Sequence, residues 1–166
     1  MALSVETGQG ITGANSYVSL ADALAYHADH GNAAWAASTD PLRTAALIRG
    51  TAALDSIYGD RWPGKRLLYT QSLDWPRAYA WDRDGYPLLL LPPQIVAATC
   101  EAALVELATP GALSLKFERG LKTLGVGAIS KSWDGNSGAG IIAYPAIRQP
   151  LARIVRGGGN VSLVRT

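Results

Sequence analysis

The chain has 166 residues, is 48% hydrophobic and carries a formal net charge of +2, which predicts one folded domain with its own core. Its single cysteine, Cys100, excludes an intrachain disulfide. No apolar run reaches the about 18 residues of a membrane-spanning helix, and residues 1–10 lack the basic and apolar regions of a secretory signal. We therefore expect neither a membrane partner nor secretion.

The charge is unevenly distributed along the chain. Residues 1–106 contain seven Lys and Arg against eleven Asp and Glu, a net charge of −4, whereas residues 107–166 contain eight against two, a net charge of +6. This asymmetry indicates either head-to-tail contact between copies or a basic surface that faces a polyanion. Chance variation in solvated charge explains it equally well.

The first predicted elements are an arm and a helix. Glycines punctuate residues 1–18, which we expect to form an extended N-terminal arm. Ser19 is a good N-cap for a helix over about residues 20–30, and Gly31 supplies a left-handed stop.

Two longer helices follow. Asp40 and Pro41 signal the start of a helix over residues 41–58. A pair of prolines opens another helix over residues 93–109, which we expect to be the central core helix. Its predicted apolar stripe, from which Glu101 and Glu106 are excluded, consists of Val96, Cys100, Ala103, Leu104 and Leu107.

Residues 60–92, between these two helices, are predicted to be a long aromatic loop. They contain three of the five tryptophans and three tyrosines, together with helix-breaking prolines and glycines. Disordered segments are poor in aromatic residues, so this loop is expected to fold onto its own core or onto a neighbouring chain. We expect Trp62 and Trp75 to be anchored inward and Trp81 to be exposed.

The remaining residues predict a β-hairpin and a tail. Residues 112–144 are the hairpin region, with a strand within residues 121–133, a glycine-rich tip at 134–140 and a return strand beyond it. Residues 145–166 are predicted to form a short helix and a strand-prone tail. That helix is expected to begin near Pro150, because a proline disrupts a helix that is already running. The predicted fold class is mainly α: a small helical bundle with a long aromatic loop, a β-hairpin and extended terminal arms.

The segments that resemble motifs for catalysis, cofactor binding or metal binding lack the neighbouring residues or elements that these motifs require. The glycines of residues 8–13 match a dinucleotide-binding spacing, but a helix rather than a βαβ unit follows them. His27 and His30 lack a third ligand, and Cys100 lies mid-helix among alanines. Asp82 opens a turn rather than a calcium loop, because the glycine spacing is wrong. We therefore expect no enzyme activity, no cofactor and no metal site.

Nucleic-acid binding has more support from the sequence. Arg61, Lys65 and Arg66 interleave with Trp62 and Tyr69, and such patterns can hold phosphates and stack bases. Further cations in the hairpin region are candidates to line a DNA channel: Lys116, Arg119, Lys122 and Lys131.

Several segments in order resemble a known family. They include Asn15-Ser16-Tyr17-Val18-Ser19, residues 25–35, residues 52–64 and Trp75-Pro76-Arg77. Across residues 3–109 the chain resembles tailed-bacteriophage proteins that are often labelled DnaT-like single-stranded DNA-binding proteins and are better understood as head–tail adaptors.

The resemblance implies a non-enzymatic virion protein at the neck, assembled in the host cytoplasm. Such adaptors form a ring, commonly twelve-fold, which contacts the portal protein, a tail or head-closure protein and the passing double-stranded DNA. The alternative is a non-sequence-specific single-stranded DNA-binding protein. The candidate subunit-interface residues are Tyr17, Trp81, Tyr86 and Trp133. The candidates for docking to the portal or to a neighbouring ring are Arg148, Arg153, Arg156, Leu163, Val164 and Arg165.

Overall fold

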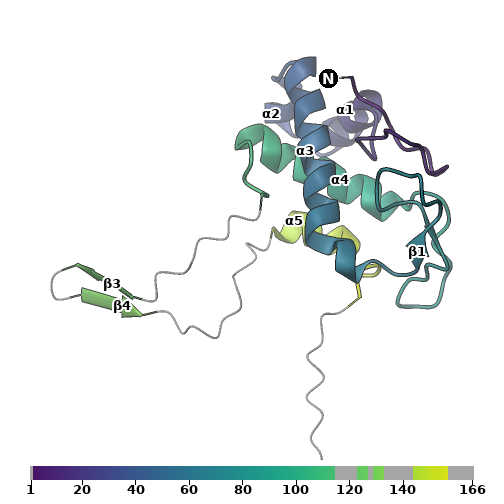
Figure 1. The fold of residues 1–166 in the computed structure, drawn as a ribbon. Helices are drawn as coiled ribbons and strands as arrows, with labels where there is room; N and C mark the ends of the chain where they lie inside the picture. Colours follow the sequence, from purple (N-terminus) through teal and green to yellow (C-terminus); the bar gives the residue numbers. More distant parts are fainter. Residues whose placement is uncertain (1, 115–122, 127–128, 133–143, 157–166) are drawn as a thin grey trace, which may run out of the picture.

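A computed structural model describes residues 2–114, 123–126, 129–132 and 144–156 of the chain. The described part is mainly helical, with five α-helices and two separate two-stranded antiparallel ladders (Figure 1). The predicted fold class is therefore confirmed.

The first two helices form one end of the bundle. Helix α1 spans Leu20–Asp29 and begins at Ser19, whose hydroxyl accepts a hydrogen bond from the Asp22 N–H as an N-cap should. Gly31 follows α1 with a φ of 65°, the predicted left-handed stop. The short helix α2, Ala33–Ala36, then buries Trp35 in the core.

Helices α3 (Asp40–Tyr58) and α4 (Pro93–Ala108) form the central packed pair. Gly50 lies where their backbones meet, because a Cβ atom there would come within 2.8 Å of the Ala103 nitrogen. Only glycine fits so close an approach. A 3₁₀ turn, η1 (Gly59–Arg61), extends α3 into the loop.

Helix α4 is the core helix, as predicted, and contacts α1, α2, α3 and α5. One prediction about α4 is wrong: Glu106 is buried rather than on the solvent side. Its carboxylate accepts hydrogen bonds from Arg49 Nε and from the backbone N–H groups of Gly111 and Leu113. The turn after α4 thus folds over a buried charge that is fully hydrogen-bonded.

The C-terminal helix begins earlier than predicted. Helix α5 spans Pro145–Leu151 and includes Pro150. Pro150 is the sixth of the seven residues of α5, so its missing N–H removes a single possible bond near the end of the helix. Burial of Ile147 and Leu151, and packing of α5 on α4, outweigh that loss.

The predicted hairpin is present in a different register. Strand β3 (Thr123–Val126) pairs antiparallel with β4 (Ile129–Ser132), and Val126 lies opposite Ile129. The connection therefore lies between residues 126 and 129, whereas the predicted tip at 134–140 lies outside the described residues. Both strands come from the stretch that the sequence assigned to one strand.

The N-terminal segment folds onto its own chain, which corrects the prediction of an extended arm. Glu6 is 1% exposed. Its Oε1 atom accepts hydrogen bonds from the N–H groups of Gly8, Gln9 and Gly10 at 2.8–2.9 Å, and Oε2 accepts one from Ile11 at 2.7 Å. The glycines that resemble a phosphate-binding motif thus enclose the chain's own carboxylate.

Candidate functional site

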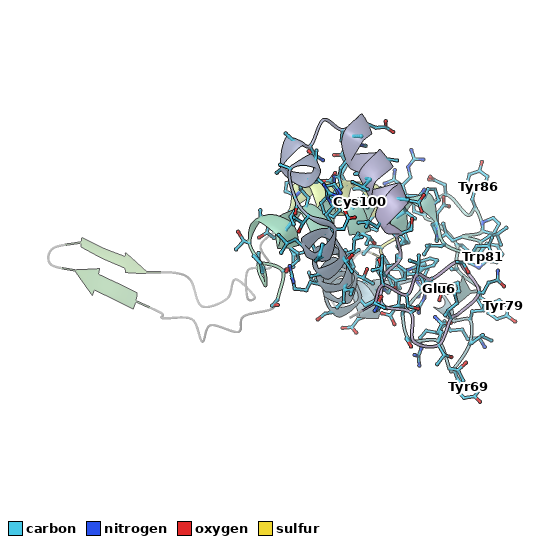
Figure 2. The ribbon with its side chains drawn as sticks, turned by 90° about the horizontal axis from the view of Figure 1, so that it is seen from above. Glu6, Tyr69, Tyr79, Trp81, Tyr86 and Cys100 are labelled. Atoms are coloured by element: carbon cyan, nitrogen blue, oxygen red, sulfur yellow. The ribbon has the colours of Figure 1, made fainter. Side chains whose placement is uncertain are left out.

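The loop between α3 and α4 exposes an unusual number of large hydrophobic side chains. Their exposed fractions run from 44% for Leu67 to 92% for Tyr69. The labelled aromatic side chains project from one end of the molecule (Figure 2). We call the set the aromatic face, and it consists of Leu67, Leu68, Tyr69, Tyr79, Trp81, Tyr86, Leu89 and Leu90.

A two-residue ladder organises the loop behind this face. Strand β1 (Lys65–Arg66) pairs antiparallel with β2 (Arg77–Ala78). The Arg77 guanidinium donates to the carbonyl oxygens of Pro63 and Gly64, at 2.6 and 3.0 Å. Arg77 thereby replaces the hydrogen bonds that a longer strand would provide.

The inner side of the loop is anchored by tryptophans, as predicted. Trp62 and Trp75 are buried and pack edge to face, with ring centroids 5.9 Å apart. The backbone N–H of Trp75 donates to the Tyr17 hydroxyl at 3.1 Å, and that hydroxyl donates to Asp55 Oδ1 at 2.6 Å. The loop is therefore tied to the N-terminal segment and to α3.

This network overturns one predicted interface residue. Tyr17 is 2% exposed, so its side chain belongs to the core and does not reach another subunit. Its tyrosine ring fills core volume while its hydroxyl finds partners on α3 and the loop.

Burial perturbs the acid in this network. It raises the pKa of the Asp55 carboxyl to about 7, and hydrogen bonds from Tyr17 and Asp74 only partly oppose it. Burial, followed by the charge of Asp55, also raises the pKa of the Tyr17 hydroxyl. The pair fastens the loop, and it lies beneath the aromatic face rather than in an open site.

Two residues of the aromatic face have strained backbones. Among the described residues, the non-glycine positions with positive φ are Tyr79, at 55°, and Leu90, at 53°. Bulky residues rarely adopt this left-handed conformation, and strain of this kind is concentrated at functional sites.

A glycine lies against each strained residue. A Cβ atom on Gly64 would clash with the Ala78 carbonyl oxygen and lie 2.8 Å from the Tyr79 carbonyl carbon. A Cβ atom on Gly8 would lie 2.9 Å from the Leu90 Cβ atom. Both glycines also have positive φ, so the backbone conformation and the close contact each disfavour a side chain there.

Several cations of the loop are engaged by the loop itself. The Lys65 ammonium lies 5.3 Å from the Tyr79 ring centroid, over its face. Arg66 donates to the Gln71 carbonyl oxygen, and Arg83 Nε lies 3.8 Å from Asp84. Asp82 closes the predicted turn by accepting from the N–H groups of Asp84 and Tyr86.

The other predicted site residues are dispersed. Trp81 and Tyr86 lie on the aromatic face, and Arg148, Arg153 and Arg156 are exposed on and after α5. Lys131 lies in β4. The remaining candidates lie outside the described residues: Lys116, Arg119, Lys122, Trp133, Leu163, Val164 and Arg165.

The segment after α5 joins the loop through its backbone. The Arg83 N–H donates to the Arg153 carbonyl oxygen, and the Arg156 N–H donates to the Arg61 carbonyl oxygen, each at 3.0 Å. The predicted docking arginines at 153 and 156 thus adjoin the aromatic loop. Sequence reasoning did not anticipate this proximity.

Two of the groups that the sequence offers for chemistry, Cys100 and His27, are buried. Burial raises the pKa of the Cys100 thiol to about 12 and lowers that of His27 to about 4. Within the described ranges, no group of three or more His, Cys, Asp or Glu is placed to hold a metal ion. Of the helices in the described part of the chain, none combines the length and apolar character needed to cross a membrane.

Sequence reasoning missed the leucines of the face. Leu89 and Leu90 belong to an apolar run in a loop, and such a run reads as buried unless its backbone is known. The signal that could have found them is the run itself, because four consecutive leucines beside prolines cannot all face one core.

The fold and the face together define a small helical protein that presents an ordered, apolar surface loop. The chain belongs to the family described as "Putative DnaT-like ssDNA binding protein", whose match covers residues 1–166. That description agrees with DNA binding, the alternative expected from the sequence, better than with a head–tail adaptor. No curated protein and no solved structure matches the chain.

Proposed function

We propose that this protein is a non-enzymatic head–tail adaptor of a tailed bacteriophage, a ring subunit between the portal and the tail around the DNA channel. The observation that carries the proposal is the aromatic face, which one ordered loop holds in solvent. Contiguous apolar surface of this kind marks sites of association with other proteins.

Burial of this face on a partner would be strongly favourable. Removing one large apolar side chain from water contributes about 1.5–3 kcal/mol. Leu89 and Leu90 remain 73% and 59% exposed in the isolated chain, so most of that free energy is still available. A ring of identical subunits would bury the same face at every joint.

The chemistry of the face favours a protein partner over a nucleic acid. Leucine offers neither a ring for base stacking nor a charge for phosphate. Arg66 and Arg77 already donate to carbonyl oxygens of the loop. The resemblance in residues 3–109 supplies the particular assembly, a ring at the virion neck.

The exposed arginines on and after α5 are the proposed contact with the portal or a neighbouring ring. Arg148, Arg153 and Arg156 are exposed, and two of them adjoin the aromatic loop through backbone hydrogen bonds. Binding of a partner to these arginines would therefore also depend on the loop being folded.

The test is assembly. The purified chain is imaged by electron microscopy and weighed by light scattering, and purified virions are probed for the protein. Rings, and the chain at the particle neck, are the expected results. A stable monomer that never joins virions would overturn the proposal.

A second candidate function is non-sequence-specific binding of single-stranded DNA. The family description favours it, and so does Lys65 beside the exposed ring of Tyr79. Binding of a labelled single-stranded oligonucleotide is measured at about 50 and 200 mM salt. Tight binding that weakens steeply with salt, and is lost in Lys65→Glu, supports this candidate. No binding at low salt excludes it.

A further inference from the structure

From the geometry, we infer that Leu68, Tyr79 and Leu90, with Lys65, form a preshaped knob that docks onto the acidic α1–α3 end of a second copy of this chain. The inference rests on the proposed ring and names the two surfaces that meet at each joint. The receiving surface consists of Asp22 and Asp29 on α1 and Leu42 near the start of α3.

The knob is held in shape from below by the N-terminal segment. Gly8 and Gly10 both donate to Glu6 Oε1. Cβ atoms on these two glycines would lie 2.9 Å from Leu90 and 3.0 Å from Leu68. One buried carboxylate thus fixes the backbone against which both leucines pack.

The strain at Tyr79 and Leu90 points to a role outside the monomer. A bulky residue in the left-handed region costs free energy, and the isolated chain gains little from these side chains because both are mostly exposed. Asparagine or glycine would fit these backbones better in a monomer. Burial of the two side chains on a partner would offset the free-energy cost of their strained backbones.

The receiving surface has acidic residues, which complement the positive charge of Lys65. Residues 19–42 contain Asp22, Asp29 and Asp40 but no Lys or Arg. Asp40 is paired with Arg43. Asp22 and Asp29 are exposed, and Leu42 is 57% exposed.

Asp29 is also unfavourably placed for its own helix. It is the last residue of α1, where the negative end of the helix dipole repels a carboxylate. A cation from a second copy, such as Lys65, would offset that repulsion. Acidic and apolar groups on one surface thus face basic and apolar groups on the other.

Because the two surfaces come from different elements, the contact is heterologous. Each subunit then offers one free knob and one free receiving surface, and the assembly grows until a ring closes. An isologous dimer that pairs two knobs would bring like charges together.

The apolar part is tested with Tyr79→Asn and Leu90→Asn. Asparagine tolerates the left-handed backbone, so each variant should melt no lower than the wild type while its self-association weakens by about tenfold or more. Sedimentation velocity over a concentration series measures association, and circular dichroism checks the fold. Unchanged association in both variants would overturn the inference.

The charged part is tested by reversal. Lys65→Glu and Asp29→Lys should each weaken association, and the two variants mixed or combined should recover it. Arg83→Glu makes the same charge change as Lys65→Glu at an exposed position of the loop outside the knob, and should leave association unaltered. Equal losses for Arg83 and Lys65, or no recovery on combination, would contradict this contact.

The outcomes separate the two proposals. If the wild-type chain assembles and all these variants assemble equally well, the ring proposal stands and the proposed contact is wrong. A wild-type chain that stays monomeric at high concentration rejects the ring as well.

Discussion

The loop of residues 60–92 has an inner and an outer side built from the same residue types. Inside, Trp62 and Trp75 pack edge to face and are almost fully buried. Outside, Tyr79 and Trp81 are 72% and 53% exposed although they lie only a few residues further along. The inner side stabilises the fold, whereas the outer side is kept ordered at a cost to the isolated chain.

Among substitutions that test this difference between the two sides, Trp75→Ala should have the largest effect on the free energy of unfolding. Truncating a buried tryptophan leaves a cavity and costs about 3–5 kcal/mol in the free energy of unfolding. It also removes the partner ring of Trp62. Urea unfolding followed by circular dichroism measures the loss, and a change below about 1 kcal/mol would contradict the anchoring role.

Gly64→Ala should destabilise the chain by about 2 kcal/mol or more, because both the left-handed φ and the contact with Ala78 and Tyr79 exclude a methyl group. Gly85→Ala is the matched control. Gly85 has a φ of 85° but open space around its Cβ position, so only the backbone cost of about 1 kcal/mol applies there. Thermal melts of the two variants should differ, and equal shifts would contradict the close approach.

Glu6→Gln should cost about 1–3 kcal/mol, because the amide nitrogen would face a backbone N–H that the carboxylate now satisfies. The loss should appear first as faster amide exchange at Gly8, Gln9 and Gly10, with α4 unaffected. Uniform exchange along the chain would show that the segment does not open independently.

Asp55 and His27 give the stability a pH dependence of opposite signs. The folded-state pKa of Asp55 is raised to about 7, so the folded chain binds the proton more tightly and stability falls as pH rises from about 4 to 7. The pKa of His27 is lowered to about 4, so stability rises between about pH 4 and 6.5.

Asp55→Asn separates the two contributions. Its stability relative to the wild type should increase steadily between pH 5 and 7 and then level off. Urea unfolding at pH 5, 6, 7 and 8 measures the difference, and a difference that does not vary with pH would refute the raised pKa of Asp55.

The smallest effect on stability is expected on the outer side. Trp81→Ala should change the free energy of unfolding by less than about 0.5 kcal/mol, because its side chain is already half in solvent. The comparison with Trp75→Ala is the direct test of the two-sided loop. A loss of similar size in both variants would show that the outer aromatics also hold the fold.

The helices were predictable because local signals agree with the tertiary fold. The Ser19 cap, the Gly31 stop and the prolines that open α3 and α4 mark ends to within a residue or two. The inward position of Trp62 and Trp75 was also predictable from their size.

The missed features all depend on partners distant in sequence or on close packing. Tyr17 was assigned to an interface because an exposed tyrosine and one bonded to Asp55 look alike in a sequence. Glu106 was placed off the apolar stripe of its helix and no pattern singled out Glu6, yet backbone N–H groups enclose both. Pro150 was read as the start of a helix, but α5 begins at Pro145 and burial of Leu151 outweighs one missing hydrogen bond.

The sequence by itself determined the three longest helices, α1, α3 and α4, the irregular aromatic loop between α3 and α4 and the family resemblance, because caps, breakers and apolar spacing act over a few residues. Only the tertiary structure decided which aromatic residues face solvent and which glycines support them. Tyr79 and Leu90 are exposed, and Gly64 and Gly8 approach them too closely to carry any side chain of their own. Such an approach joins segments far apart in the chain, and no local pattern of residues records it.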